Sequence, residues 1–400
     1  MNIRRVTVVL FFLLLAGSAA GATRRLNECT TAVISPQAAL TGNAMLWKNR
    51  DTDELSNRVI FVRENPFNYL ALVDSGDTSG RWVYAGVNST GFAIINSVAY
   101  NLPERANEKQ DLEGLIMADA LRSCRTVADF ENYLRRNSGA NLGSLANFGV
   151  IDAQGEACLF EVHNHGFEKY PADSFPEKYI VNTNFSRSGT PGTGRGYIRF
   201  ERASTLFKTI PAGTISVQSI FGLLARDLGH PLIAHPAYAD LKKSPMRKPL
   251  WIFTHDTIDR SATASAVVIH GKKKGAEESI ATMWVILGEP ICSIALPLWV
   301  EAEETPLLLH EGGTAPICRE ALRIKKKVRP FREADKVDYL EMTKLDNREG
   351  KGFLPLILKT EQEIIEAANQ FLTERHTPQE LAHFQTEMAI KALSALRQIQ

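Results

Sequence analysis

Short apolar runs separated by turn residues dominate the N-terminal part of the chain, and such runs predict β-strands rather than long helices. After an apolar stretch at residues 6–16, the pattern predicts strands at 29–35, 43–47, 58–63 and 69–73. Glycines at both ends of the segment 86–91 then predict a tight turn that leads into a further apolar strand.

The middle of the chain mixes helical and strand-like periodicity. Apolar residues at helical spacing predict a helix over 112–121, and Thr126 caps a second one. A glycine-rich loop at 189–196 precedes two more predicted helices, at 197–208 and 216–228. Strand-like runs complete this region, at 147–162 (a hairpin), 178–184, 263–270, 278–287 and 291–299.

The C-terminal tail is predicted to be helical. Thr377-Pro378-Gln379-Glu380 has the form of a capping box with proline at the first helical position, and the apolar stripe after it predicts a packing face. The chain therefore runs from strands to helices and back to strands, without regular βαβ alternation. This order indicates an α+β fold with mainly antiparallel sheets.

Composition and charge narrow the function classes. The 400 residues are 44% hydrophobic and 23% charged, and 46 basic side chains nearly balance 45 acidic ones. These values are typical of a globular protein. The formal net charge of +1 gives no reason to expect nucleic acid or an anionic membrane as a partner.

The N-terminus has the three-part layout of a secretory signal peptide. Arg4 and Arg5 precede the apolar stretch, and small residues follow it up to Ala22. Residues 1–22 are therefore expected to be removed on export to the periplasm or the medium. The apolar stretch falls short of the ~20 residues of a membrane-spanning helix. A lipid anchor at Cys29 is disfavoured, because Cys29 lies far from the apolar stretch.

Cys29 is the first chemically distinctive residue after this signal. Removal of residues 23–28, a short pro-segment, would leave Cys29 with both a thiol and a free α-amine. An amine with a pKa near ~7.7–8.0 is partly unprotonated at neutral pH, so it can act as the base for its own thiol. A buried, inert side chain is the alternative for a cysteine taken alone.

The other four cysteines form no recognisable motif. Cys124, Cys158, Cys292 and Cys318 include no C-x-x-C pair and no zinc-ligand spacing. In an oxidising compartment they can pair with one another and leave Cys29 free. They can equally serve as small core residues, and the sequence leaves both interpretations open.

Polar residues near predicted strand ends supply partners for a nucleophile at Cys29. Lys48-Asn49-Arg50-Asp51 closes the second strand, so a hairpin can return Lys48 or Asp51 to the thiol. Asn96 and Asn184 end two later strands, and Arg199 follows the glycine loop. A carboxylate would orient the amine, amide N–H groups would bind an oxyanion, and a cation would favour the thiolate.

In this order the motifs resemble those of the cysteine N-terminal-nucleophile (Ntn) hydrolases that cleave linear amides. This group includes choloylglycine hydrolase, penicillin V acylase and acyl-CoA:6-aminopenicillanate acyltransferase. The resemblance covers about residues 29–300. Its matched segments are Cys29-Thr30, Lys48 to Asp51, the turn 86–91 with the strand after it, Thr183-Asn184, Arg199-Phe200-Glu201-Arg202 and the hairpin 261–290.

The resemblance implies a four-layer αββα sandwich. We expect residues 29–345 to form the catalytic domain and the helical tail, residues 346–400, to pack on it as an extension. The resemblance also implies an amidase or acyltransferase that forms an acyl-thioester on Cys29. The residues expected to take part in catalysis with it are Asp51, Asn184 and Arg199, and those expected to bind substrate or the oxyanion are Asn96, Lys48 and Thr183. The expected partner is a small-molecule amide. No cofactor or metal is required, and homo-oligomer formation is left open.

The chain also departs from the family pattern. Lys48 stands where bile-salt hydrolases have arginine, so bidentate clamping is lost. Asn96 does not align cleanly with the first oxyanion position of the family, which uses a backbone N–H, and Val98 is nearer by count. Two alternatives stay open: a dipeptidase of the same superfamily, whose members also begin Cys-Thr-Thr, and a non-catalytic exported binding protein.

Overall fold

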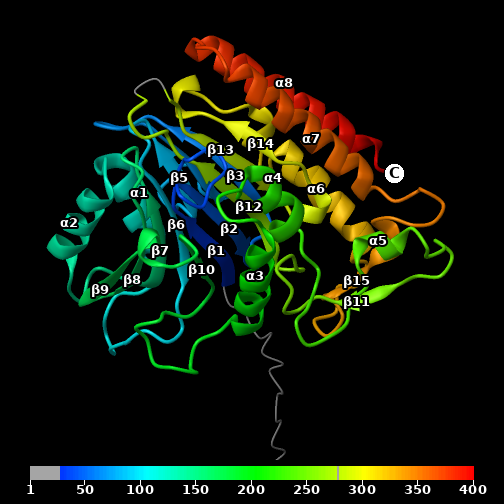
Figure 1. Cartoon of the computed structure of the whole chain (residues 1–400), viewed down its shortest axis with the longest axis horizontal. Helices are drawn as coiled ribbons and strands as arrows, with labels where there is room; N and C mark the ends of the chain where they lie inside the picture. The colour runs from blue at the N-terminus through cyan, green and yellow to red at the C-terminus, as the bar shows by residue number, and fades with distance from the viewer. Residues whose placement is uncertain (1–27, 277–278) are drawn as a thin grey trace, which may run out of the picture.

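The computed structural model describes residues 28–276 and 279–400, so the expected signal peptide and residues 23–27 of the expected pro-segment lie outside the described residues. Two β-sheets pack face to face at the centre of the molecule, and helices cover both outer faces (Figure 1). This is the αββα layer order that the sequence resemblance implied. Pairings within both sheets are antiparallel among the described strands, as the chain order predicted.

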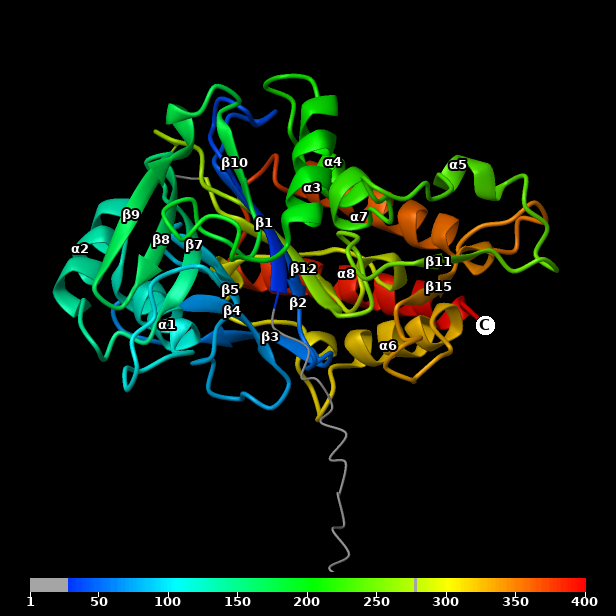
Figure 2. The same cartoon turned by 90° about the horizontal axis from the view of Figure 1, so that it is seen from below.

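The first sheet carries the start of the described chain on β1 (Glu28–Ile34), an interior strand next to an edge strand. Within the described residues its strand order is β10 (Tyr179–Asn182), β1, β2 (Met45–Asp51), β12 (Thr263–His270), β13 (Thr282–Leu287) and β14 (Leu296–Leu298). Figure 2 shows β1, β2 and β12 running side by side. Strands β2 and β12 are far apart in sequence, so their pairing brings distant side chains to one place.

The second sheet is a meander in chain order. Its described strands are β3 (Asn57–Val62), β4 (Tyr69–Asp74), β5 (Ala85–Asn88), β6 (Ala93–Val98), β7 (Leu145–Ile151), β8 (Ala157–His163) and β9 (Gly166–Pro171). The two sheets approach closely at Gly149, where an added Cβ would lie 2.9 Å from Val33 Cγ2 and 3.0 Å from Ile95 Cγ1. A larger residue at Gly149 would therefore push the two sheets apart.

The helices form the two outer layers. Those on the second sheet are α1 (Glu113–Ser123) and α2 (Val127–Asn137). Those beside the first sheet are α3 (Tyr197–Thr209), α4 (Val217–Ser219), the π-helical turn η2 (Ile220–Ala225), α6 (Pro316–Val328), α7 (Leu354–Phe371) and α8 (Pro378–Gln398). The capping box predicted at Thr377 is present and begins α8, which packs on β14, α6 and α7. A short ribbon of β11 (Trp251–Phe253) and β15 (Tyr339–Glu341), with α5 (Tyr238–Leu241) nearby, lies at one end of the molecule (Figure 2).

Two of the predicted elements were wrong in extent. The strand predicted at 291–299 is a 3-10 turn over Pro290–Cys292 followed by the short strand β14. Proline lacks an N–H for a sheet ladder, and Pro297 confines this segment to the edge of the sheet. The helix predicted at 216–228 ends at Ala225 and is helical only in short pieces.

Candidate active site

Cys29 lies at the start of β1, opposite Arg50 of β2, and its side chain is buried. Glu28 precedes it in the described chain, so the nitrogen of Cys29 is here a peptide nitrogen. That nitrogen donates a hydrogen bond of 2.9 Å to Oδ1 of Asn184. Asn184 follows β10, the strand on the other side of β1. The two neighbours of β1 therefore bring their side chains to the start of the same strand.

Lys48 places a buried cation beside the Cys29 side chain. Its side chain is fully buried, and its ammonium donates to Oδ1 of Asn96 at 2.6 Å and to the carbonyl oxygen of Tyr84 at 2.9 Å. Burial lowers the pKa of Lys48 to about 8, although interaction with the Cys29 thiolate opposes this shift. Asn96 therefore holds Lys48 through its side-chain carbonyl oxygen.

Asn184 is oriented by three partners. Its Oδ1 accepts hydrogen bonds from the Cys29 nitrogen and from Nη2 of Arg199, both at 2.9 Å, and its Nδ2 donates to the carbonyl oxygen of Val98 at 2.9 Å. The carbonyl end of the amide therefore faces the nitrogen of Cys29. Because Arg199 and Val98 hold both ends of the amide, the side chain of Asn184 is preorganised.

Arg199 lies in the first turn of α3 and is completely buried. Its Nη1 donates to the carbonyl oxygen of Cys29 at 2.6 Å and to Oγ1 of Thr30 at 3.0 Å. The glycine loop places it here: Gly196 has φ +76°, and a Cβ at that position would lie 2.7 Å from Nη2 of Arg199. Thr183 donates a hydrogen bond from Oγ1 to the carbonyl oxygen of Gly196. It therefore stabilises the loop that carries Arg199.

Asp51 is buried and pairs with a residue that the sequence did not single out. Its Oδ2 accepts from Nε of Arg260 at 2.8 Å, and its Oδ1 accepts from Oγ1 of Thr263 at 2.8 Å. Arg199 Nη1 lies 3.9 Å from the same carboxylate. Arg50, the sequence neighbour of Asp51, forms an ion pair with Asp74.

Arg260 is a site residue that the sequence pattern did not indicate. It lies just before β12 in a turn closed by hydrogen bonds between Arg260 and Thr263, and Thr263 is the register partner of Asp51. The sequence does show an arginine shortly before the predicted strand 263–270. However, local pattern does not predict that this strand pairs with β2, so nothing in the sequence indicated that Arg260 lies beside Asp51.

Glu28 completes a group of four charged side chains. Its Oε2 accepts from Nη2 of Arg199 at 2.7 Å and from Nη2 of Arg260 at 2.6 Å. Burial raises the pKa of the Glu28 carboxyl, but the two arginines lower it more, and the result is a pKa below the usual value. Glu28 is therefore ionised at neutral pH.

The structure thus brings Cys29, Lys48, Asn96, Asn184 and Arg199 into one connected group. Asp51 joins this group through the arginines, and Thr183 supports the loop that carries Arg199. All of the sequence-predicted residues lie at or beside the start of β1. Two of them have contacts that the sequence did not indicate: Asn96 accepts a hydrogen bond from Lys48, and Asn184 accepts one from the nitrogen of Cys29.

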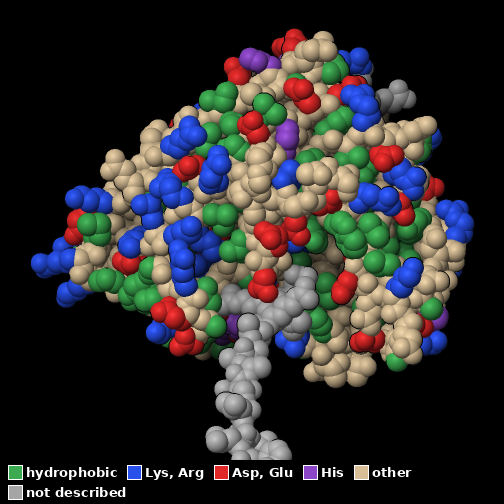
Figure 3. Space-filling model, turned by 180° about the vertical axis from the view of Figure 1, so that it is seen from behind, with side chains coloured by type: hydrophobic (Ala, Val, Ile, Leu, Met, Phe, Trp, Pro, Cys, Tyr) green, Lys and Arg blue, Asp and Glu red, His purple; other side chains and the backbone are tan. Residues whose placement is uncertain are grey.

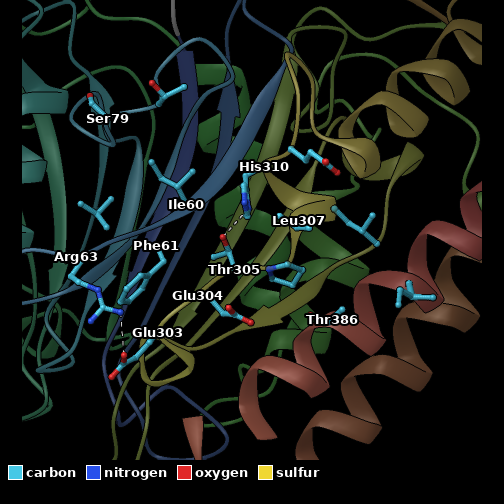
Figure 4. A pocket seen from close by; sticks show the side chains of 16 residues that line it. Ile60, Phe61, Arg63, Ser79, Glu303, Glu304, Thr305, Leu307, His310 and Thr386 are labelled. Carbon is cyan, nitrogen blue, oxygen red and sulfur yellow. Dashed lines mark hydrogen bonds and ion pairs between the residues drawn. The ribbon is translucent and has the colours of Figure 1, made fainter. Parts of the chain in front are cut away.

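One cavity elsewhere on the molecule does not involve this group. Figure 4 shows a cavity of about 940 Å³ between β3 and the segment 303–311, where Arg63 pairs with Glu303 and Thr305 contacts His310. Cys29 and its contacts do not line it, as far as the described residues go. On the face in Figure 3, acidic, basic and apolar side chains are interspersed, in keeping with the balanced charge.

The cysteine pairing that the sequence left open does not occur among the residues that the structure describes. All five cysteines are free and buried thiols. His165 pairs with Glu108, and no cluster of three or more metal-ligating side chains occurs in the described part of the chain. Across residues 28–276 and 279–400, no helix combines the length and the apolar character needed to cross a bilayer.

Comparison with known proteins gives structural matches only. No family model matches the sequence, and no curated protein matches it. Similar solved structures include penicillin V acylase from Agrobacterium tumefaciens, with 16% identity, a TM-score of 0.41, and coverage of 68% of this chain and 85% of that one. A mutant of conjugated bile acid hydrolase from Clostridium perfringens has 10% identity and a TM-score of 0.38, over 63% of this chain and 88% of that one.

Proposed function

We propose that this chain is the precursor of an exported hydrolase of linear amides whose nucleophile is Cys29, released as the first residue of the mature protein. The observation that supports this most directly is the environment of the Cys29 nitrogen. It is held by Oδ1 of Asn184, beside a buried lysine that contacts the Cys29 side chain. Once unacylated, that nitrogen would be a positioned base for its own thiol.

The proposed reaction proceeds through a thioester. The Cys29 sulfur forms a bond to the amide carbonyl carbon, and the α-amine of Cys29 takes the thiol proton. Collapse of the tetrahedral intermediate breaks the C–N bond, and the same proton passes to the leaving amine. Water then attacks the thioester, releases the acid and restores the thiol; an acceptor amine in place of water would make the reaction an acyl transfer.

Several neighbours would assist this reaction. Lys48 would stabilise the thiolate as a nearby cation. Nδ2 of Asn184 has a second hydrogen besides the one that it donates to Val98, and this hydrogen would bind the oxyanion. Arg199 would keep Asn184 and the Cys29 carbonyl in place through its hydrogen bonds to both.

Mass spectrometry of the secreted protein tests the proposal. A mature chain that begins at Cys29 is expected, and Cys29→Ala should lose activity by about a thousand-fold or more, since it removes the nucleophile. Cys124→Ala is the matched control, because Cys124 is also a buried free thiol. Full activity of Cys29→Ala, or an active chain that still carries Glu28, would overturn the proposal.

A substrate panel distinguishes the alternatives within this chemistry. An N-acyl amino acid, a conjugated bile salt and a dipeptide should be compared with the same mature preparation. Cleavage of the dipeptide alone would assign a dipeptidase. A secreted chain that retains residues 23–28 and turns over none of these amides would indicate a binding protein instead.

A further inference from the structure

The side chain of Glu28 occupies a buried site made by two arginines from distant parts of the chain. Arg199 comes from α3 and Arg260 from the turn before β12. Their side chains are 0% and 7% exposed, and both donate to the same oxygen of Glu28, whose side chain is 14% exposed. This geometry is that of a carboxylate-binding site, with an occupant supplied by the residue just before Cys29.

Removal of Glu28 would unbalance the charges in this site. With Glu28 present, two arginines face two carboxylates, since Asp51 also pairs with Arg260. Without it, two buried cations share the single carboxylate of Asp51. In addition, Nε of Arg199 is buried and has no hydrogen-bond partner among the described residues. A buried cation that loses its partner is strongly unfavourable, so the vacated site favours another anion.

The position of Glu28 in the precursor also indicates how far a substrate carboxylate would lie from the amide that is cleaved. The carbonyl carbon of Glu28 is bonded to the nitrogen of Cys29, and its side-chain carboxylate reaches both arginines. Arg199 is hydrogen-bonded to the carbonyl oxygen of Cys29 and to Asn184, which holds the Cys29 nitrogen. A carboxylate bound to the two arginines would therefore lie a short chain away from an amide under attack by Cys29.

Given the proposed release of Cys29 as the N-terminal nucleophile, we propose that Arg199 and Arg260 form a carboxylate subsite that selects amides bearing a carboxylate close to the scissile bond. Glu28 fills this subsite before the Glu28–Cys29 bond is cut, and the substrate carboxylate fills it afterwards. A glutaryl group reproduces the spacing between the backbone carbonyl of Glu28 and its side-chain carboxylate. The carboxylate of an amino acid in the amine part of the substrate is the other source of the same chemistry.

Paired substrates test this selectivity with the mature enzyme. Glutaryl anilide is compared with the analogue whose carboxylate is a primary amide, and valeryl-glycine with valeryl-glycinamide. At least one acid should exceed its neutral partner by about tenfold or more in kcat/KM, as expected for a charge-assisted hydrogen bond of ~1.5–3 kcal/mol. The pair that shows the preference identifies the side of the amide that carries the carboxylate.

Variants connect this preference with the arginines. Arg260→Gln should bring the acid-to-neutral ratio of kcat/KM to about one, because a loss of rate caused by the missing partner of Asp51 lowers both values alike. Arg260→Lys should retain part of the preference. Arg202→Gln is the matched control. Arg202 also lies on α3, but its ion pair is with Asp227 and not with Glu28. Equal rates for acid and neutral partners in the active wild-type enzyme, or an unchanged preference in Arg260→Gln, would overturn the inference and leave the proposed function standing.

A binding measurement separates failure of the subsite from failure of the enzyme. Calorimetric titration with glutarate is made on two Cys29→Ala chains, one beginning at Thr23 and one beginning at residue 29. The shorter chain should bind glutarate, the longer one should not, and Glu28→Ala in the longer chain should restore binding. Absence of binding to the shorter chain contradicts the subsite whether or not the protein is an enzyme.

Discussion

At the scale of single residues, the feature that sets this site apart is a lysine beside the cysteine. Lys48 is buried, its pKa is lowered to about 8, and its ammonium is held by the side chain of Asn96 and the backbone of Tyr84. Arginine would remain charged at any physiological pH, whereas this lysine loses its charge as the pH rises through about 8. The Lys48 cation is thus present below that pH and lost above it.

This difference predicts a pH dependence. The wild-type kcat/KM should decline above about pH 8 as Lys48 loses its proton, and Lys48→Arg should shift that decline to higher pH. Lys48→Met should reduce kcat/KM by about 10–100-fold, since it removes a charge-assisted contact to the thiolate. Lys169→Met, at a lysine paired with Glu131 far along the chain, is the control. An alkaline limb that is identical in wild type and Lys48→Arg would contradict this role.

At the scale of elements, the glycine loop 189–196 and the first turn of α3 together position the side chain of Arg199. Gly196 has φ +76°, a conformation that favours glycine, and the space where a Cβ would lie is occupied by Arg199 and Thr183. Gly192 in the same loop has the same φ of +76° and no atom within 4 Å of an added Cβ. An alanine at either glycine would strain the backbone, but only an alanine at Gly196 would also collide with Arg199 and Thr183.

Alanine substitution at these glycines gives a matched pair. Both Gly196→Ala and Gly192→Ala should lower the free energy of unfolding by about 1–2 kcal/mol, because both place alanine at positive φ. Only Gly196→Ala should also lower kcat/KM, by about tenfold or more, since its Cβ displaces Arg199. Unfolding in denaturant and steady-state kinetics measure the two effects, and equal activity in both variants would show that Arg199 does not depend on this loop.

At the scale of the whole molecule, the four layers place the site at the end of the first sheet. A buried carboxyl group well away from the site, that of Glu113, links the free energy of unfolding to pH. Glu113, at the start of α1, is buried and accepts a hydrogen bond from the backbone of Leu145. Burial raises the pKa of Glu113 from its ordinary value to about 7. The folded protein therefore binds more protons than the unfolded chain between about pH 4.5 and 7.

The contribution of Glu113 to stability is complete below pH 4.5 and falls as the pH rises through 7. Glu113→Gln does not titrate, so it should be more stable than wild type at pH 8, by about 1–3 kcal/mol, and similar at pH 5. Exposed Glu374→Gln is the control and should change little at either pH. Denaturant unfolding at the two pH values measures this difference. A stabilisation of Glu113→Gln over wild type that is larger at pH 5 than at pH 8 would contradict the prediction.

Much of the fold was predictable from local pattern. Apolar periodicity and caps predict strands near 29–35, 58–63, 69–73 and 263–270 and helices that begin near 112 and 378, and the structure confirms them. The segment 291–299 was not predictable in the same way, because its apolar run reads as a strand although Pro290 and Pro297 restrict it to a turn and a short edge strand.

The sequence by itself determined the residue types of the site and the α+β class, since a cysteine at the start of a predicted strand, strand-end amides and apolar periodicity are local features. Only the tertiary structure decided which side chains meet. The pairing of β2 with β12 brings Arg260 to Asp51, and the approach of α3 to β1 brings Arg199 to Glu28. Such pairings depend on the packing of whole sheets and on long-range register, which no local run of residues encodes.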